Sequence, residues 1–546
     1  GKAALTVNFK TNVNSKVYEK WYINNIFIFN DYNPTKALNN SIDYLTNIDT
    51  TLYFSDDFID YYILKKQQII IKPKYTTKQL YLYPDSLFSL KSTQTSYLHL
   101  SKYRIYKLTN IEFLESDDSS KNYLDCNIKL SPDKKTDIIY ELEATNSSLS
   151  NGGAANLSYV HRNLFKGGEV LDLNLEFAFQ RQKTLDTTSS ALFNTLEYSF
   201  NLNITFPRLL IPFKITKFIM QNNPRTIILT KFAYQDRPEF NRIEAILNWD
   251  YYMKSSQVSN FIFTPLRFSS TRVLYIAPEY LAYIRSVQLE ESYKDHFVFG
   301  SRLSYTFSNQ GEAKNNTFFQ TNIAIAGNSL FAIMKSFNAD TINGVYNFPL
   351  FETPFAQFVK ANIDYRYYLN SVNDDNRLIF RLFVGAGIPY GNSNLMPFGE
   401  KYFSGGANSI RAWQARTLGP GEYAQPEELI YINQTGDIKI EFNFEYRFSI
   451  ISILEGAIFL DAGNIWEFYS LDEDATKMFS FNKFYKQFAY GTGAGLRLNS
   501  SYFVFRTDVG LKLVDPKLPE YSRIIPFERK FEWKDLSLNI GIGYPF

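Results

Sequence analysis

The residue types that most often catalyse reactions or bind metals are few and scattered in this sequence. His99, His161 and His296 are isolated, and no His and Glu pair has the spacing of a metal site. Cys126 is the only cysteine, so the sequence can form neither an intramolecular disulfide nor a thiolate metal cluster. We interpret Cys126 as a small residue of the strand LDCNIKL. We therefore expect no enzyme, no cofactor and no metal.

A different chemistry is indicated by one arginine and two later carboxylates. Arg411 lies between Gly399 and Gly421, in a stretch too rich in Gly and Pro for a strand or helix interior. If this loop folds into the space enclosed by the following strands, its planar guanidinium could meet Glu445 and Asp461 in charge-assisted hydrogen bonds. The alternative is a solvated loop cation. We expect the first arrangement, because both acidic segments are present.

The segments that carry these carboxylates alternate strictly between two kinds of side chain. The sequence from Gly436 to Phe448, GDIKIEFNFEYRF, puts isoleucine and aromatic side chains on one face and charged or amide side chains on the other. The next segment, Ile453 to Trp466, repeats this with Asp461 on the charged face. A transmembrane β-barrel needs both faces, because lipid surrounds it and its lumen is polar.

The composition supports this fold class and excludes others. The 546 residues include 49 Phe, 40 Tyr and 5 Trp, an excess that aromatic girdles at two membrane interfaces would explain. The net charge of +2 and the absence of a Lys/Arg run exclude nucleic acid as a partner. No apolar stretch reaches the roughly 18 residues of a transmembrane helix, so a helical membrane protein is excluded.

Residues 1–133 differ from the rest and are predicted to form a small α+β module, either one with an insertion or one and a half. Its expected strands are Trp21–Phe29, Gln68–Pro73, Arg104–Leu114 and Asn122–Leu130, and its partly helical segments are Asp56–Lys65 and Ser86–Tyr103. Since the chain starts at Gly1 without a signal peptide or initiator Met, we expect that an N-terminal part has been removed.

Residues 134–546 are predicted to form an all-β transmembrane barrel of about sixteen antiparallel strands, because single-chain bacterial barrels have an even number. The expected strands are 137–146, 153–161, 169–182, 190–205, 226–237, 239–253, 256–266, 294–308, 316–327, 354–370, 377–389, 436–448, 453–465, 487–497, 501–513 and 535–546. With the N-terminal module in the periplasm, the loop at 390–435 is predicted to be extracellular and Arg162–Gly168 to form a short periplasmic connection.

The final segment, Asp535 to Phe546, alternates in the same way. Its pattern predicts that Tyr544 and Phe546 point outward with the leucines and isoleucines, and that serine, asparagine and glycine point inward. A chain that ends on an aromatic residue after such a strand resembles the C-terminal assembly signal of outer-membrane barrels.

The loop motif Gly405–Trp413, GGANSIRAW, resembles the sixth-loop signature of the outer-membrane assembly-factor superfamily that includes BamA, TamA and the lipoprotein TamL. The residues that carry this resemblance with Arg411 are Gly405, Gly406, Ile410 and Trp413. FLDAGNIW, from Phe459 to Trp466, resembles the acidic strand motif of this family, and FEYRF, from Phe444 to Phe448, resembles the strand before it. Two shorter matches are LFKGG at Leu164–Gly168, an early periplasmic turn, and GAGLRL at 493–498, a late strand.

The resemblance implies a periplasmic POTRA domain at residues 1–133 and a location in the outer membrane of a bacterial cell. It also implies assembly and insertion of β-barrel proteins through a seam between the first strand, 137–146, and the last. Ala412 and Trp413 depart from the commoner Gly-Phe or Gly-Tyr. With one or two modules rather than five, this departure favours the TamL-like branch, for which N-terminal lipidation stays open.

The partners implied are outer-membrane lipids, unfolded outer-membrane protein clients, and a periplasm-spanning TamB-like protein or accessory lipoproteins. The alternative function is an outer-membrane pore for protein secretion or solute transport, because about sixteen strands could leave an aqueous channel. The POTRA-like module and the three motifs in their order favour an assembly factor, and the same motifs argue against an adhesive barrel.

Overall fold

The computed structural model describes residues 19–39, 48–55, 59–116, 122–146, 150–182, 193–212, 222–286, 293–311, 314–342, 344–349, 353–371, 376–424, 434–469, 474–500 and 503–546. The chain divides into two compact units. The first comprises Gly1–Ile138, Tyr159–Asp172 and Ile204–Arg225, and the second comprises Ile139–Ser158, Leu173–Asn203 and Thr226–Phe546.

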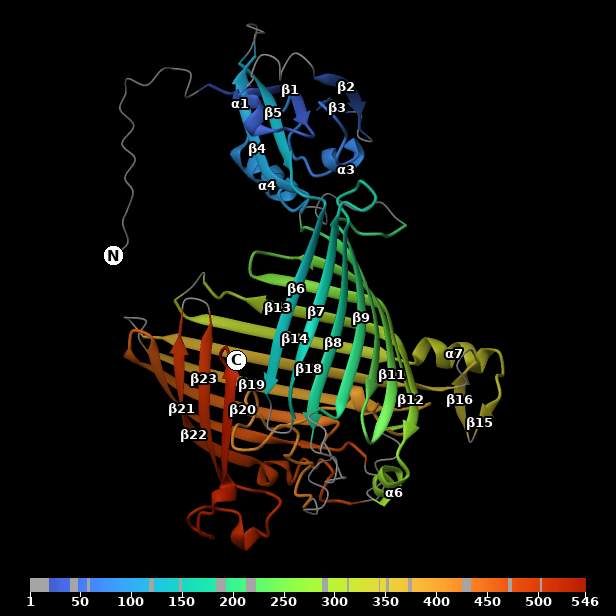
Figure 1. The fold of residues 1–546 in the computed structure, drawn as a ribbon, viewed down its shortest axis with the longest axis vertical. Helices are drawn as coiled ribbons and strands as arrows, with labels where there is room; N and C mark the ends of the chain where they lie inside the picture. The colour runs from blue at the N-terminus through green and yellow to red at the C-terminus, as the bar shows by residue number, and fades with distance from the viewer. Residues whose placement is uncertain are drawn as a thin grey trace. The chain divides into compact units, whose positions relative to one another are not determined.

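The first unit contains a mixed five-stranded sheet and short helices (Figure 1). Its elements are β1 (Tyr22–Phe29), α1 (Pro34–Asn39), β2 (Asp49–Phe54), β3 (Asp60–Lys65), α3 (Pro73–Thr77), α4 (Leu90–Leu100), β4 (Tyr106–Glu115) and β5 (Tyr123–Pro132). The strand order is β2-β3-β1-β5-β4, in which β1 runs parallel to β3 and β5. Apolar side chains from the strands and from α4, including Ile26, Ile128 and Leu100, form a buried core.

The prediction of partly helical structure at Asp56–Lys65 is wrong. Its described second half is strand β3, which pairs antiparallel with β2 and parallel with β1. Tyr61 and Ile63 are buried, whereas Asp60 is exposed. This period-two pattern of aromatic and β-branched residues fits a pleated sheet better than a helix face.

The prediction of a strand at Gln68–Pro73 is also wrong. The backbone N–H groups of Ile70 and Ile71 donate to Oδ1 of Asn30 at 2.7 and 3.2 Å instead of to a neighbouring strand. Pro73 then begins α3, where its missing N–H leaves no additional unsatisfied donor. The apolar run is therefore a core-lining connection.

The second sheet is a closed barrel (Figure 1). Its strands are β6 (Thr136–Asn146), β7 (Ser150–Arg162), β8 (Val170–Gln182), β9 (Thr195–Phe206), β10 (Arg225–Asp236), β11 (Phe240–Lys254), β12 (Ser259–Ile276), β13 (His296–Ser308), β14 (Asn316–Ala326), β15 (Thr341–Ile342), β16 (Val345–Phe348), β17 (Thr353–Ala356), β18 (Phe358–Asn370), β19 (Asn376–Pro389), β20 (Ile438–Ile451), β21 (Leu454–Trp466), β22 (Ala489–Asn499), β23 (Val504–Val514) and β24 (Leu536–Ile542). They are ordered along the chain, and β24 neighbours β6.

Three of these nineteen strands are short and belong to one connection. β15, β16 and β17 have 2, 4 and 4 residues and lie between β14 and β18, which also pair directly. Within the described residues, sixteen longer strands therefore remain in the barrel. Helix α7 (Asn328–Ser336) belongs to the same connection and packs Leu330 and Met334 against Phe297 and Phe355.

The remaining helices are short and connect strands. They are α6 (Pro278–Ser286) and the 3-10 turns η3 (Phe398–Glu400), η5 (Phe484–Gln487), η6 (Glu520–Ser522) and η7 (Trp533–Asp535). None of the helices in the described ranges has the length and the apolar character needed to cross a membrane.

The alternation in β20 separates an apolar outer face from a polar inner face. Glu441, Asn443 and Glu445 are buried, whereas Phe442 is 45% exposed on the other face. In the ladder with β21, Asn443 lies opposite Asp461. Because directly opposite residues share a face, Glu445 and Asp461 both point into the barrel.

Strand β12 is longer than predicted. The sequence pattern favours a strand that ends at residue 266, close to Pro265, whereas β12 continues to Ile276. Its pairing with β13 shifts register between Thr264 and Arg267, at Pro265. A proline lacks a ladder donor, and the chain accommodates it as an irregularity in the strand instead of ending the strand.

The predicted outward direction of Tyr544 and Phe546 is wrong. Strand β24 ends at Ile542, and the next residue, Gly543, has φ 89°, a left-handed conformation that favours glycine. After this turn, Phe546 is only 9% exposed and packs with Ile379, which lies opposite the inward Glu445 in the ladder of β19 and β20. Gly543 therefore redirects the chain end into the barrel.

Candidate functional site

The loop between β19 and β20 lies against the inner face of the barrel. Its described residues are 390–424 and 434–437, so that 425–433 of the predicted loop at 390–435 lie outside the described residues. Ile410, Ala412, Trp413 and Leu418 form a buried cluster with Ala489 of β22. The apolar residues of the loop motif thus contact the barrel wall.

A tight turn built on two glycines shapes this part of the loop. Gly405 and Gly406 have φ 92° and 93°, which side chains rarely allow. The N–H of Gly406 donates to the carbonyl of Trp413 at 2.8 Å, and the N–H of Trp413 donates to the carbonyl of Ile410 at 3.1 Å. This local closure places Arg411 at the tip that faces β20 and β21.

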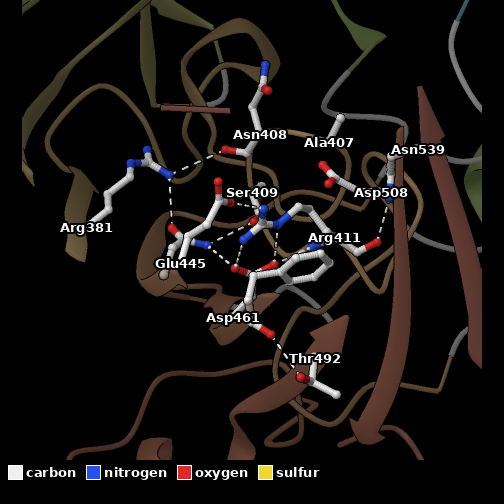
Figure 2. Close-up of polar contacts among 12 residues, drawn as sticks. Arg381, Ala407, Asn408, Ser409, Arg411, Glu445, Asp461, Thr492, Asp508 and Asn539 are labelled. Atoms are coloured by element: carbon white, nitrogen blue, oxygen red, sulfur yellow. Dashed lines mark hydrogen bonds and ion pairs between the residues drawn. The ribbon is translucent and has the colours of Figure 1, made fainter. Parts of the chain in front are cut away.

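Arg411 is fully buried between two carboxylates, as Figure 2 shows. Its N, Nε and Nη2 donate to the carboxylate of Asp461 at 3.0, 2.9 and 2.9 Å. Its Nη1 donates to Oε2 of Glu445. Both carboxylates are themselves fully buried, and Asn443 donates to Asp461 at 2.9 Å. The structure therefore brings together the three residues singled out as a loop-to-barrel contact.

The guanidinium of Arg411 also packs on an aromatic ring of the wall. Its Cζ lies 3.5 Å from the ring centroid of Phe459, within the range of a cation–π contact. Burial by itself lowers the pKa of Arg411, but Asp461 and Glu445 outweigh this effect and raise it. Arg411 is therefore cationic, and its charge is neutralised by neighbours rather than by water.

Glu445 belongs to a wider buried network that the sequence analysis did not identify. Arg447 and Arg497 each pair with Glu445, and Arg497 also pairs with Asp508 at 2.6 Å. With Arg411 and Asp461, these residues form a cluster of three cations and three carboxylates, and a fourth cation, Arg506, lies 3.7 Å from Asp508. The signal for this network was present, because Arg447 and Arg497 fall on inward positions of the segments FEYRF and GAGLRL.

The loop also contacts the last strands of the barrel. Nδ2 of Asn539, in β24, donates to the carbonyl of Arg411 at 2.8 Å (Figure 2). Arg506, in β23, donates to the carbonyl of Ala407 at 3.1 Å and to Oδ1 of Asn408 at 2.9 Å. The loop motif is thus bonded to β20 and β21 through Arg411, and to β23 and β24 through Arg506 and Asn539.

Close approach of the loop depends on glycines in the wall. A Cβ on Gly510 would lie 2.7 Å from the carbonyl oxygen of Arg411, and one on Gly491 would lie 2.6 Å from Cβ of Ala412. Such distances are shorter than van der Waals contact. Ala412 and these two glycines are therefore matched in size. This complementarity could not be predicted from the sequence, because it depends on three segments far apart in the chain.

The two C-terminal aromatic residues lie beside this network. Phe546 places its ring centroid 5.5 Å from Cζ of Arg411, and Tyr544 places its ring 4.2 Å from Cζ of Arg447. The hydroxyl of Tyr544 lies 3.1 Å from a carboxylate oxygen of Glu455. The end of the chain therefore contacts Arg411 of the loop and Arg447 of β20.

The arrangement is suited to holding a loop against the barrel wall. Within the described ranges, no group of three or more His, Cys, Asp or Glu residues could hold a metal ion. His99 faces Gln79 in the first unit, whereas His296 begins β13. A buried network of ion pairs ties two segments together strongly when intact, because removing one member leaves a buried charge without a partner.

Comparisons with known proteins agree with this geometry. Residues 140–544 match the family model described as the Omp85 superfamily domain. A segment of 98 residues, 17% of the chain, is 29% identical to the outer membrane protein assembly factor BamA of Neisseria meningitidis serogroup B, and spans only 12% of that protein.

Among solved structures, the chain is similar to BamA from Haemophilus ducreyi lacking POTRA domains 1–3. The TM-score is 0.57 at 11% identity, over 95% of this chain and 99% of that one. CdiB from Acinetobacter baumannii gives a TM-score of 0.49 at 11% identity, over 96% and 89%. At this identity the likeness to BamA shows the fold alone.

Proposed function

The chain belongs to the Omp85 superfamily, and from this premise we propose that it assembles and inserts β-barrel proteins at the bacterial outer membrane. The observation that carries the proposal is the buried ion pair of Arg411 with Asp461 and Glu445. This ion pair holds a long loop inside the barrel, where the loop also touches the last strand through Asn539.

We propose that the working part is a seam between β6 and β24. Strand β24 pairs with β23 over only seven residue pairs, whereas β18 and β19 pair over thirteen. On β6, Tyr140 is 77% and Leu142 is 88% exposed, so these side chains have little packing. A seam of this kind could open sideways and allow a client strand to add by β-augmentation, while the short strand thins the bilayer locally.

The finer assignments are part of the same proposal. We place the sixteen long strands across the membrane, residues 1–133 in the periplasm as a POTRA-like module, and the loop at 390–435 on the extracellular side. Clients would be unfolded outer-membrane proteins, and a TamB-like protein or accessory lipoproteins would bind the edges of the module. Ala412 and Trp413 favour the TamL-like branch. No catalytic step or cofactor is assigned to the chain.

The second candidate is a pore for protein secretion or solute transport. Its support is the inner face of the barrel, which carries many charged side chains, such as Arg381 and Asp364. The loop argues against a simple channel, because its residues occupy part of the lumen and are bonded to β20, β21, β23 and β24.

One reconstitution distinguishes the two candidates. The purified chain is placed in liposomes, and the folding of an unfolded outer-membrane barrel client is followed by its protease resistance, with empty liposomes as the control. The proposal predicts faster client folding without rapid leakage of an entrapped dye. Leakage without any effect on client folding would establish the pore instead.

A further inference from the structure

The connection between β14 and β18 covers part of the outer face of the barrel. It contains α7 and the short strands β15, β16 and β17, and Figure 1 shows α7, β15 and β16 together at the side of the barrel. His296 and Val298 of β13 line a cavity between the wall and the loop that joins β19 to β20. Because side chains alternate along a strand, Phe297 points to the opposite, outer face. Leu330 and Met334 of α7 pack against Phe297, so the helix lies on that outer face.

The apolar side of α7 is wider than its contact with the wall. Leu330 and Met334 are buried, but Ile333 is 48% exposed, and Phe337, the residue after the helix, is 81% exposed. Residues four apart lie on one side of a helix, so Ile333 and Phe337 form an uncovered apolar edge beside the buried contact. Lys335 is two positions from each of them, which places it on the opposite side of the helix, and it is exposed. The helix therefore has a third surface that the protein leaves uncovered and that is not polar.

This uncovered edge continues the apolar outer face of the neighbouring strands. Ile323 and Ile325 of β14 are exposed, and Ile323 lies opposite Leu303 of β13. Leu303 is also exposed and shares the outer face with Phe297, because the two are an even number of residues apart. Helix α7 begins three residues after Ile325. The outer face of an outer-membrane barrel is covered by lipid, so the uncovered edge of α7 adjoins a lipid-facing surface.

The connection carries little charge. Among the described residues of 327–357, the charged ones are Lys335 and Asp340, one cation and one carboxylate. A surface without net charge has no electrostatic preference for an anionic or a cationic partner. Amphipathic helices that lie in a membrane interface bind through buried apolar area together with attraction to anionic lipids, and here the apolar area alone is available.

We propose that the connection between β14 and β18 anchors the barrel on the lipid bilayer. Ile333 and Phe337 insert at the boundary between headgroups and acyl chains, and Lys335 on the opposite side of α7 stays in water. Phe358, which follows the connection, lies opposite Pro389, after which the loop at 390–435 begins. The connection is therefore at the rim that we place on the extracellular side, and the lipid that it contacts belongs to the outer leaflet.

The anchor rests on the proposed placement of the long strands across the membrane, but not on the opening of a seam. β13 and β14 are the eighth and ninth of the sixteen long strands, and the seam lies between the sixteenth and the first. The anchor is therefore half-way round the barrel from β6 and β24. It would fix the wall opposite the proposed seam at the membrane surface.

Spin labels on single cysteines test the anchor in the whole chain, in a Cys126→Ala background and in vesicles of phosphatidylcholine. Phe337→Cys places a nitroxide on the uncovered edge, and Lys335→Cys is the matched control on the other side of the same helix. Ile323→Cys reports the outer face of the barrel. Collisions of each label with oxygen, which concentrates in lipid, and with a water-soluble nickel chelate are measured. The label at 337 should match the one at 323, with more oxygen collisions and fewer nickel collisions than the label at 335. Adding phosphatidylglycerol should not change this result, because the connection has no net charge.

A nitroxide is itself apolar, so the native chain is tested as well, with a phosphatidylcholine that carries a photoreactive group on its acyl chain. Cross-links to Ile333 or Phe337 but not to Lys335 support the anchor. Absence of such cross-links, or a label at 337 as open to nickel as the one at 335, overturns it. If the label at 323 is then in lipid, the placement of the strands stands and the uncovered edge is left for a protein partner. If the label at 323 is in water too, the placement across the membrane fails together with the anchor.

Discussion

At the scale of single residues, the docking of the loop depends on the charge of Arg411 and on two glycines of the wall, Gly491 and Gly510. Arg411 links Asp461 and Glu445, but the two carboxylates do not depend on it equally. Glu445 also pairs with Arg447 and Arg497, whereas the other described donor to the carboxylate of Asp461 is the neutral Asn443. Loss of Arg411 would therefore leave Asp461 as the buried charge without a cation.

Arg411→Ala is expected to release the loop. A buried carboxylate without its partner costs on the order of 3 to 5 kcal/mol, and less to the extent that water enters. The measurement is the rate of protease cleavage in the loop together with the thermal unfolding of the purified chain. Arg411→Lys should fall between the native chain and Arg411→Ala, because lysine keeps the charge but loses the bidentate geometry. Lys530→Ala, which removes an exposed loop cation, is the control. Equal protease resistance of Arg411→Ala and the native chain would contradict a holding role.

Gly510→Ala is expected to displace the loop without removing any polar contact of a side chain. The new Cβ would meet backbone atoms of Arg411 and Ala412 at 2.7 and 2.8 Å, and backbone cannot move aside as a flexible side chain does. Faster loop proteolysis, with destabilisation of about 1 to 3 kcal/mol, is the predicted result. Gly399→Ala is the matched control, because no atom lies within 4 Å of its added Cβ. The same cleavage rate in both variants would show that the loop does not pack closely against Gly510 of β23.

At the scale of elements, the loop is anchored at a second place through its 3-10 turn. Glu400 of η3 pairs with Arg267 of β12 and, at 3.3 Å, with Lys360 of β18. Burial alone would raise the pKa of Glu400, but Arg267 and Lys360 outweigh it and hold the pKa below the ordinary value. The loop is thus attached both to the strands after it and to strands before it.

This anchor predicts a definite dependence on pH. Because the pKa of Glu400 is lower in the folded state than in the unfolded state, its contribution is complete above the unfolded pKa, about 4.3. The contribution is lost as the pH falls through the lower folded pKa. Loop proteolysis by an acid-stable protease should therefore rise between about pH 5 and pH 3, and Glu400→Gln should show a smaller rise from a higher baseline. A rise of the same size in both proteins would contradict the prediction.

Much of the strand pattern could be predicted from the sequence, because each barrel strand repeats its chemistry with period two. The positions at which strands end were harder to predict. Gly543 turns Tyr544 and Phe546 inward, although the alternation that precedes it predicts the opposite, and one left-handed glycine leaves no periodic signal. Strand β12 passes Pro265 because β11 and β13 hold it on both sides, which local propensity does not reveal.

The residues of the candidate site likewise fall into those that could be predicted from the sequence and those that could not. Arg411, Glu445 and Asp461 could be selected because each carries charge at a position whose face the alternation defines. Arg497, Asp508 and Asn539 were missed. The alternation of GAGLRL marks Arg497 as inward, but which residues of other strands it meets depends on the register between strands, which cannot be read from one sequence.

At the scale of the whole molecule, the loop is connected to the proposed seam. The same segment that carries Arg411 also bonds to Asn539 of β24, which neighbours β6. A loop held by buried ion pairs would stabilise β24 in its place. Release of the loop would make the seam between β6 and β24 easier to open. The proposed mechanism therefore requires β6 to separate from β24 during client insertion.

A reversible disulfide across the seam shows whether this separation is required. Cysteine pairs, one in β6 and one in β24, are introduced into a Cys126→Ala background, and the pairs that oxidise are assayed for client folding in liposomes. A control pair replaces Leu498 and Phe505, which lie directly opposite each other in β22 and β23. The account predicts that oxidised seam pairs stop client folding, that a reductant restores it, and that the control pair has no effect. Full client folding with the seam locked would contradict the account.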